Sequence, residues 1–230
     1  MLTLSINGMI NTMRYAQKRH YEWSREIAYS VGLMASDGCL QKDSRHLDLT
    51  SVDIEQLQNF SKALGRDLPI SKKDNISDTP AYRVQFSDVA YYDFLLAAGL
   101  TPAKSHTIAT LNIPDEYYAD FLRGLFDGDG SCYAYMDKRW KSSYMFYATF
   151  TAASAPFLRY IQVSNSTLLG TSSGSLRVSG NAYILSYAKA DAKILFSKMY
   201  YSDSVLCLKR KHAKLSGFTK RSKNDTITQV

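Results

Sequence analysis

The chain carries one succession of apolar and polar patterns twice. In the first copy, an apolar run ending at residue 38 precedes stretches that alternate as strands do and runs with the spacing of amphipathic helices. The strand candidates lie at 39–42, 46–51, 68–73 and 80–87, and the helix candidates at 52–65 and 88–99. The pattern predicts the order α-β-β-α-β-β-α for this half.

A second copy of the same order begins near residue 114, where a proline and acidic residues are typical of a helix start. Its apolar run ends at residue 130, and its later elements are expected at 131–137, 144–152, 154–170, 172–179, 181–188 and 189–200. We therefore predict an α+β fold of two pseudo-symmetric αββαββα halves. The expected division is 1–20 (N-terminal extension), 21–100 (first half), 101–113 (linker), 114–216 (second half) and 217–230 (basic C-terminal tail).

The two apolar runs end in related motifs, "SVGLMASDG" (30–38) and "LRGLFDGDG" (122–130). When Gly32 is aligned with Gly124, Asp37 falls on Asp129, whereas Asp127 falls on Ala35. Small residues four apart on each helix allow two helix backbones to approach closely, which would bring Asp37 and Asp129 together. Two carboxylates at two negative helix ends repel each other, and either a proton or a divalent cation relieves that repulsion. Oxygen-only ligands favour Mg²⁺, with Mn²⁺ as a substitute and Ca²⁺ as an alternative.

Composition changes this picture only in part. The net charge of +7 favours a polyanionic partner. Residues 204–223 hold seven Lys or Arg and no acid, although a solvated basic tail explains that run equally well.

No apolar run reaches the roughly 18 residues of a membrane span, and the N-terminus lacks the pattern of a secretory signal. Three cysteines without a CxxC pair argue against a disulfide framework or a zinc site. We expect a protein that is not secreted and resides in the cytoplasm or an organellar matrix.

The two motifs resemble those of the LAGLIDADG homing endonucleases, closely at 122–130 and more loosely at 30–38. Two motifs in one chain are similar to the monomeric, pseudo-symmetric branch of that family. The resemblance implies two αββαββα halves whose motif helices pack at the centre and whose saddle-shaped antiparallel sheets straddle double-stranded DNA. It further implies a site-specific, metal-dependent double-strand break in a long target, with Asp37 and Asp129 as metal ligands. Asp127 is expected to be structural or auxiliary.

The resemblance also implies auxiliary catalytic residues. A polar residue at the end of the second strand of each half positions water, and alignment of the following helices assigns this role to Asp53 and Ser154. Because serine positions water weakly, the two half-sites are expected to differ. A basic residue near the end of each half stabilises the phosphate, and the candidates are Lys104, and Lys209 or Lys211. For each lysine, an ordinary phosphate contact is an equally good interpretation.

Recognition of DNA is assigned to the strands, because a two-stranded β-ribbon fits the major groove. The candidate DNA contacts are basic and lie on strands or turns: Lys42, Arg45, His46, Lys72, Lys73, Arg83, Lys138, Arg139, Lys141 and Arg177. Four tyrosines, at 133, 135, 144 and 147, either contact DNA or pack within the sheet, and we expect packing for about half of them.

Three alternatives compete with cleavage. An RNA-splicing maturase of the same fold would keep the basic surface without needing both acids. A non-cleaving DNA-binding regulator would usually carry a helix-turn-helix region, for which the residues after Leu215 leave little room. A structural basic domain does not explain the repeated motif. Because no intein splicing blocks flank the motifs, an intron-encoded or free-standing enzyme is preferred.

Overall fold

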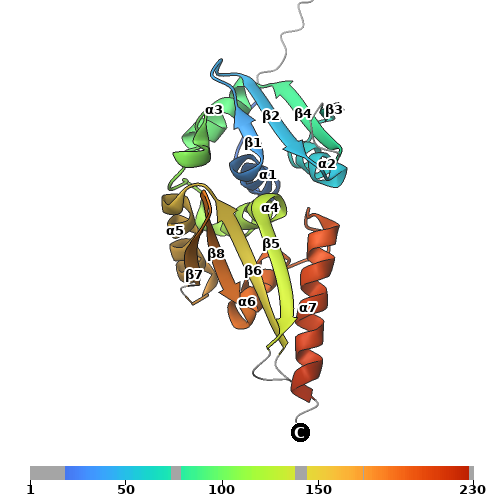
Figure 1. The fold of residues 1–230 in the computed structure, drawn as a ribbon. Helices are drawn as coiled ribbons and strands as arrows, with labels where there is room; N and C mark the ends of the chain where they lie inside the picture. Colours follow the sequence, from blue (N-terminus) through green and yellow to red (C-terminus); the bar gives the residue numbers. More distant parts are fainter. Residues whose placement is uncertain (1–18, 74–78, 138–143, 173, 228–230) are drawn as a thin grey trace, which may run out of the picture.

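The computed structural model describes residues 19–73, 79–137, 144–172 and 174–227, and its elements follow the order expected from the sequence (Figure 1). The first half consists of α1 (Arg25–Ser36), β1 (Gly38–Leu40), β2 (His46–Ser51), α2 (Ile54–Ala63), β3 (Ile70–Lys73), β4 (Ala81–Ser87) and α3 (Val89–Ala97). Two short 3₁₀ helices, η1 (Lys104–His106) and η2 (Asp115–Tyr117), lie in the connection to the second half.

The second half repeats this order and adds a final helix. It consists of α4 (Tyr118–Asp129), β5 (Gly130–Met136), β6 (Tyr144–Ala152), α5 (Ala155–Ser164) with a π-helical extension η3 (Asn165–Leu169), β7 (Ser175–Ser179), β8 (Ala182–Ala188), α6 (Lys189–Met199) and α7 (Lys209–Ile227). Polar residues begin several of the helices. Ser24, Asp88 and Ser154 each accept a hydrogen bond from an amide in the first turn of α1, α3 and α5, as helix N-caps do.

Each half contains one antiparallel four-stranded sheet, and the two sheets have equivalent strand orders. The orders are β1-β2-β4-β3 and β5-β6-β8-β7. Helices α2 and α3 pack on the first sheet, and α5 and α6 on the second. On the opposite face, side chains are only partly buried or exposed along most of each sheet's length. We call these two surfaces the open faces of the first and second sheets.

Helices α1 and α4 lie side by side between the two sheets (Figure 1). Glycines make the approach possible: a Cβ on Gly32 would overlap the Phe121 carbonyl oxygen and lie 2.6 Å from Leu125 N, and a Cβ on Gly124 would overlap the Tyr29 carbonyl oxygen. The predicted close packing of the two motif helices is therefore present. Because backbone touches backbone, this contact leaves almost no freedom in the relative position of the two halves.

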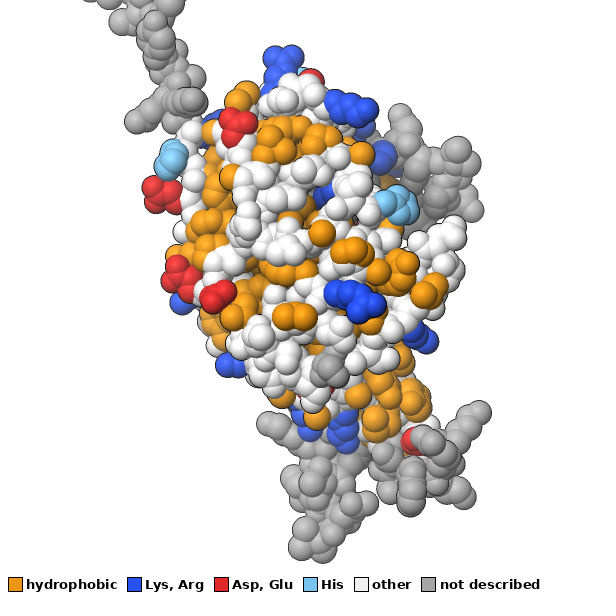
Figure 2. All heavy atoms as spheres, turned by 90° about the vertical axis from the view of Figure 1, so that its left-hand side faces the viewer, with side chains coloured by type: hydrophobic (Ala, Val, Ile, Leu, Met, Phe, Trp, Pro, Cys, Tyr) orange, Lys and Arg blue, Asp and Glu red, His pale blue; other side chains and the backbone are white. Residues whose placement is uncertain are grey.

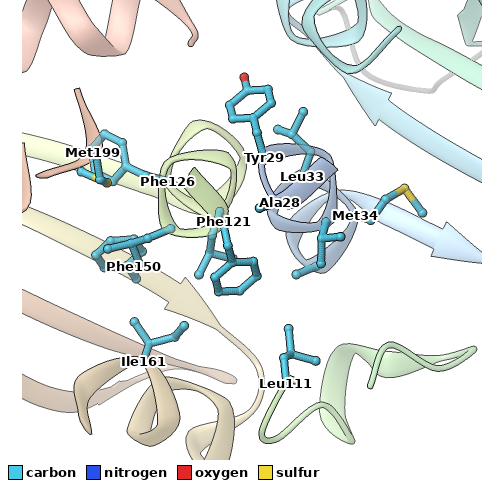
Figure 3. Close-up of a cluster of buried hydrophobic side chains, with 14 of the residues drawn as sticks. Ala28, Tyr29, Leu33, Met34, Leu111, Phe121, Phe126, Phe150, Ile161 and Met199 are labelled. Carbon is cyan, nitrogen blue, oxygen red and sulfur yellow. The ribbon is translucent and has the colours of Figure 1, made fainter. Parts of the chain in front are cut away.

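The apolar core is continuous across the α1–α4 contact rather than divided between the halves. In Figure 3, Phe126, Met199 and Phe150 fill the space on one side of α4, while Leu33 and Met34 project from α1 and Ala28 lies against α4. Phe121, Phe126, Leu33 and Met34 are all completely buried. The two halves therefore share one core and are expected to unfold together.

Helix α7 is a departure from the sequence-based prediction, which placed a basic tail after residue 216. The helix continues to residue 227 and runs along β5 and β6 (Figure 1). Leu215 is completely buried, and the Phe218 ring packs against Tyr144 and Phe146 at centroid distances of 6.4 and 6.1 Å. Leu215 and Phe218, one helical turn apart, therefore hold α7 against the protein. The many charged residues around them made this apolar pair hard to recognise in the sequence.

The positive charge does not gather into one patch on the side of the molecule that carries α3, α5 and β7. Figure 2 shows that side: hydrophobic and uncharged side chains cover most of it, and Lys and Arg are scattered singly over it. No helix in the described ranges is both long and apolar enough to span a bilayer.

Replacing Gly124 by alanine should destabilise the whole protein. Overpacking of this kind costs about 1–3 kcal/mol or more, because the added methyl group meets the backbone of Tyr29 rather than a movable side chain. Urea unfolding monitored by circular dichroism measures the loss. Gly217→Ala is the matched control, since Gly217 lies in α7 with open space around it, and alanine there should be neutral or stabilising. Equal stabilities of the two variants would contradict the packing role of Gly124.

Candidate active site

The C-terminal ends of α1 and α4 bring Asp37 and Asp129 together. Asp37 is the C-cap residue of α1 and Asp129 is the last residue of α4. A Cβ on Gly128 would collide with the Ser36 hydroxyl and lie 3.0 Å from the Asp37 carboxylate, so the absence of a side chain at 128 leaves room for that carboxylate. The structure therefore places the two aligned aspartates as neighbours between the sheets.

The acidity of both aspartates is weakened by their surroundings. Desolvation raises the pKa of Asp129 to about 6, and the negative charge of Asp37 adds to that increase. Desolvation also raises the pKa of Asp37, against the lowering effect of a hydrogen bond from Gln56 and the charges of Lys211 and Lys104. The pair is thus held in a state in which additional positive charge is favourable.

Two buried lysines stabilise the helix ends that carry these acids. Lys211 Nζ lies 2.7–2.8 Å from four carbonyl oxygens at the end of α4, those of Phe126, Asp127, Gly128 and Gly130. Lys104 Nζ donates to the Gly38 carbonyl at 2.6 Å, just beyond α1. Burial lowers the pKa of both lysines. Each cation lies against carbonyl groups at or just beyond a negative helix end, which explains how carboxylates can be tolerated there.

The structure distinguishes the two lysine candidates in α7. Lys209 is exposed, and its Nζ lies 3.9 Å from Glu55 at the protein surface. Lys211 is 8% exposed and adjoins both acids through its contacts with the end of α4. Of the two, only Lys211 lies where its charge acts on the aspartate pair.

A pocket of about 270 Å³ beside Asp37 contains the first predicted water-positioning residue, Asp53. Arg210, which comes from the second half, binds Asp53 through Nε at 2.9 Å and through Nη2 at 2.5 Å. These hydrogen bonds lower the pKa of Asp53, so it remains ionised. Gln56 Nε2 donates to Asp37 at 2.7 Å.

Gln56 and Arg210 were not among the residues selected from the sequence. Gln56 occupies a core-facing position of α2 and is 2% exposed, and a polar residue at such a position was the available signal. For Arg210 no local signal existed, because its partner lies 157 positions away.

The equivalent pocket beside Asp129 has the same volume, about 270 Å³, but a different lining. Ala153 and Phe157 occur there, and Lys104 and Ser105 from the connection between the halves also line the pocket. Phe157 takes the place that Gln56 has in the first half when α5 is aligned with α2. The two half-sites are therefore chemically unequal.

Ser154, the second predicted water-positioning residue, does not reach this pocket. Its hydroxyl donates to the Ile108 carbonyl at 2.5 Å and accepts from Phe157 N at 3.3 Å, and the residue is 2% exposed. Both hydrogen bonds are structural: one caps α5 and the other fastens the connection between the halves. With its hydroxyl committed in this way, Ser154 has no means of orienting a water molecule.

Asp127 has a structural position, as the asymmetry of the motifs suggested. It is 1% exposed and accepts hydrogen bonds from Tyr29 Oη at 2.8 Å and Leu208 N at 2.7 Å. These contacts tie α4 to α1 and to the start of α7. Burial raises the pKa of Asp127 to about 6.

The candidate DNA-contacting residues occupy different parts of the first half. Lys73 and Arg83 lie on the open face, where Lys73 Nζ donates to Thr50 Oγ1 at 3.3 Å and Arg83 is opposite Thr50 in register. Lys72 alternates to the other face, opposite Tyr82. The remaining candidates of this half lie at or beside the β1–β2 turn: Lys42, Arg45 and His46.

The structure describes only one of the four basic DNA-contact candidates of the second half. Arg177 is exposed on β7, in register with Ile184. Lys138, Arg139 and Lys141 fall outside the described residues. Tyr144 is 5% exposed and packs in the core, whereas Tyr133, Tyr135 and Tyr147 alternate with it onto the open face.

The aspartate pair is suited to hold a divalent cation. Within the described ranges, no cluster of three or more histidine, cysteine, aspartate or glutamate side chains offers a complete metal cage. The two carboxylates supply only oxygen, however. Burial, and after it the charge of Asp37, raises the pKa of Asp129, and a dication would favour the ionised form against both effects. This donor set fits Mg²⁺ or Mn²⁺ with ligands completed from outside the chain, as Mg²⁺ commonly requires.

Comparison with solved structures identifies the fold. The chain is similar to the homing endonuclease I-WcaI bound to its DNA recognition sequence (TM-score 0.59, 12% identity, covering 84% of this chain and 86% of that one). It is also similar to the LAGLIDADG meganuclease I-AabMI bound to uncleaved DNA (TM-score 0.57, 15% identity, 87% and 92%). The chain therefore has the LAGLIDADG endonuclease fold, with both motif-bearing halves in a single chain.

A third similar structure is full-length DUF199/WhiA from Thermatoga maritima (TM-score 0.56, 14% identity, covering 90% of this chain). The present chain spans 66% of the length of that protein. No protein-family model and no curated protein matches the sequence.

Replacing Asp129 by asparagine should stabilise the metal-free protein at neutral pH. The pKa of Asp129 is raised, so ionised Asp129 destabilises the fold above about pH 6, and the penalty is absent below the unfolded value near 3.8. The expected gain at pH 7.5 is about 1 kcal/mol after allowance for solvent screening, and it should shrink at pH 4.5. Urea unfolding at both pH values measures it. A variant that is less stable than the wild type at pH 7.5 would show that the carboxylate is structural.

Proposed function

We propose that this chain is a site-specific DNA endonuclease that makes a metal-dependent double-strand break. The observation that carries the proposal is the pair Asp37 and Asp129, held between two equivalent sheets by the closest helix contact in the described structure. An acid that is costly to ionise and lies at a junction of two symmetric halves is poorly explained by a structural role.

The arrangement supports phosphodiester hydrolysis at two sites. Bound Mg²⁺, for which Mn²⁺ can substitute, would offset charge on the phosphate and on the leaving 3′ oxygen. Asp37 and Asp129 would hold it, while Lys104 and Lys211 fix the helix ends and add positive charge behind the acids. Asp53 and Gln56 would orient water on the Asp37 side. With no histidine in either motif, the proton would leave through ordered or bulk water.

Double-stranded DNA is the proposed partner. I-WcaI and I-AabMI, which share the fold, are DNA complexes, and the net charge of +7 suits a polyanion. Each open face would lie in the major groove of one half of the target. Because one chain supplies both acids and both sheets, a monomer suffices. As an intron-encoded or free-standing enzyme, it would act wherever the target genome resides, in the cytoplasm or an organellar matrix.

A second candidate is a non-cleaving DNA-binding protein of the same fold, since the fold alone, which full-length DUF199/WhiA shares, does not require cleavage. An RNA-splicing maturase is the third. Neither role requires two opposed carboxylates at the helix ends, so the aspartate pair favours cleavage over both.

Incubation with a randomised duplex library and Mg²⁺, followed by sequencing of the new ends, tests the proposal. We expect enrichment of one long site, with cut ends on both strands. Asp129→Asn should reduce cleavage at least about 100-fold while retaining DNA binding, since Asp129 would hold the metal and does not belong to the open faces that would contact the bases. Tight, specific DNA binding without cut ends in Mg²⁺ or Mn²⁺ would reject the nuclease in favour of the non-cleaving role. Specific binding to RNA alone would favour the maturase.

Because Gln56 occurs in only one of the two pockets, its replacement should slow the cleavage of one DNA strand more than that of the other. Gln56→Ala should slow the cut made on the Asp37 side by about 10–100-fold, because Gln56 positions the Asp37 carboxylate. A supercoiled plasmid carrying the selected site would then accumulate as the nicked form. Gln58→Ala, at an exposed position on the same helix, is the matched control. Equal slowing of both strands would show that Gln56 serves both half-sites.

A further inference from the structure

Three tyrosines form a stacked cluster on the open face of the second sheet. The rings of Tyr133 and Tyr147 have centroids 5.2 Å apart and planes 14° apart, and those of Tyr135 and Tyr147 are 6.1 Å and 8° apart. Tyr133 is 40% exposed and Tyr135 is 46% exposed. Packing within the protein does not account for this exposed surface, because the helices of this half lie on the other side of the sheet.

Most other side chains of this face are aliphatic or carry small hydroxyl groups, as Ser131, Thr149 and Ser186 do. Met145 lies opposite Tyr135 in register, and Ile184 lies nearer the active site, opposite Thr151. Among the described residues of this face, the only basic side chain is Arg177 on the edge strand β7.

The equivalent face of the first sheet has a different chemistry. Its side chains include His46, Asp48, Lys73, Arg83 and Gln85, which alternate outward along β2, β3 and β4. Arg83 Nε is buried without a hydrogen-bond partner, although arginine is the side chain best suited to bind guanine bidentately. The first sheet thus offers charged and amide groups, while the second offers an exposed aromatic cluster among aliphatic side chains and small hydroxyl groups.

The tyrosine face is continuous with the aspartate pair. Strand β5 begins at Gly130, immediately after Asp129, and runs away from the central helices (Figure 1). Tyr133 and Tyr135 are therefore about 13 and 20 Å along the strand from Asp129, at roughly 3.3 Å per residue. At about 3.4 Å per base pair, this reach corresponds to about four to six base pairs of a duplex whose cleaved phosphate is at Asp129.

The apolar feature that a base pair presents in the major groove is the C5-methyl group of thymine. We infer that the second sheet selects a thymine-rich half-site through the Tyr133–Tyr135–Tyr147 cluster, while the first sheet selects its half-site by hydrogen bonds centred on Arg83. This inference rests on the proposed binding of duplex DNA and adds the identity of the bases recognised. The thymines are expected about four to six base pairs from the cut made at Asp129.

The test replaces thymine by deoxyuridine, which removes only the methyl group. Each half of the selected site is substituted separately, and Kd is measured in Ca²⁺ by fluorescence anisotropy. A buried methyl group contributes about fourfold in affinity, so substitution at two contacted thymines should raise Kd by about 16-fold in one half only. Site selection with Arg83→Ala identifies the other half, since base preference should relax there.

Two variants connect the effect to the cluster. Tyr133→Ser should abolish the difference between thymine and deoxyuridine in the thymine-rich half. Val178→Ala removes an apolar side chain that is 70% exposed but alternates to the other face of the same sheet, and it should leave the difference intact. Circular dichroism confirms that both variants fold.

The outcomes separate this inference from the proposed function. Specific binding with no sensitivity to the methyl groups, or equal sensitivity in both halves, would overturn the thymine assignment and leave the nuclease standing. Retention of the full methyl effect by Tyr133→Ser would also overturn it. Failure to bind any duplex would reject the proposed function itself, and the inference with it.

Discussion

The contact between the backbones of α1 and α4 is the constraint on which the rest of the structure depends. Gly32 and Gly124 have no side chains, so each helix lies directly against carbonyl and amide groups of the other. This contact joins the two cores into one, sets the two sheets on either side of a common centre, and brings the helix ends together. The neighbouring positions of Asp37 and Asp129 are a consequence of this packing, since each acid simply follows the helix that carries it.

At the centre, lysines offset the negative helix ends, while the aspartates stay costly to ionise. Lys104 and Lys211 bind the terminal carbonyls of the two helices, which neutralises the dipole ends without forming direct ion pairs with the acids. The carboxylates therefore keep oxygen atoms available for a cation, and the raised pKa of Asp129 is the remaining cost. Arg210 works differently: it pairs with Asp53 and keeps that carboxylate ionised on one side only. The two ionised acids suit a cation but destabilise the fold. The two lysines stabilise the helix ends and also add positive charge near the acids.

Much of this was predictable from local sequence, and the remainder depended on distant contacts. The repeated motif and its glycine spacing predicted the two halves, the order of their elements and the packed helices, because periodicity and small-residue spacing are local properties. Ser154 was assigned by alignment with Asp53, yet its hydroxyl is bound to Ile108 in the connection between the halves, which alignment does not reveal. The part of α7 after residue 216 was expected to be a basic tail because it is rich in Lys and Arg. The contacts of Lys211 with the end of α4 join residues more than 80 positions apart, which local sequence does not show.

The halves have the same backbone plan but different surfaces. The pocket beside Asp37 has more polar residues than the pocket beside Asp129, and an exposed aromatic cluster occurs on the second sheet only. Such divergence is possible in a single chain because its two halves, unlike the subunits of a homodimer, need not have the same sequence. The central claim remains that both acids act on one shared centre. Anomalous diffraction from crystals of the DNA complex grown with Mn²⁺ tests it most directly. The account predicts metal peaks within ligand distance of both Asp37 and Asp129; peaks that contact neither acid, or only one of them, would contradict it.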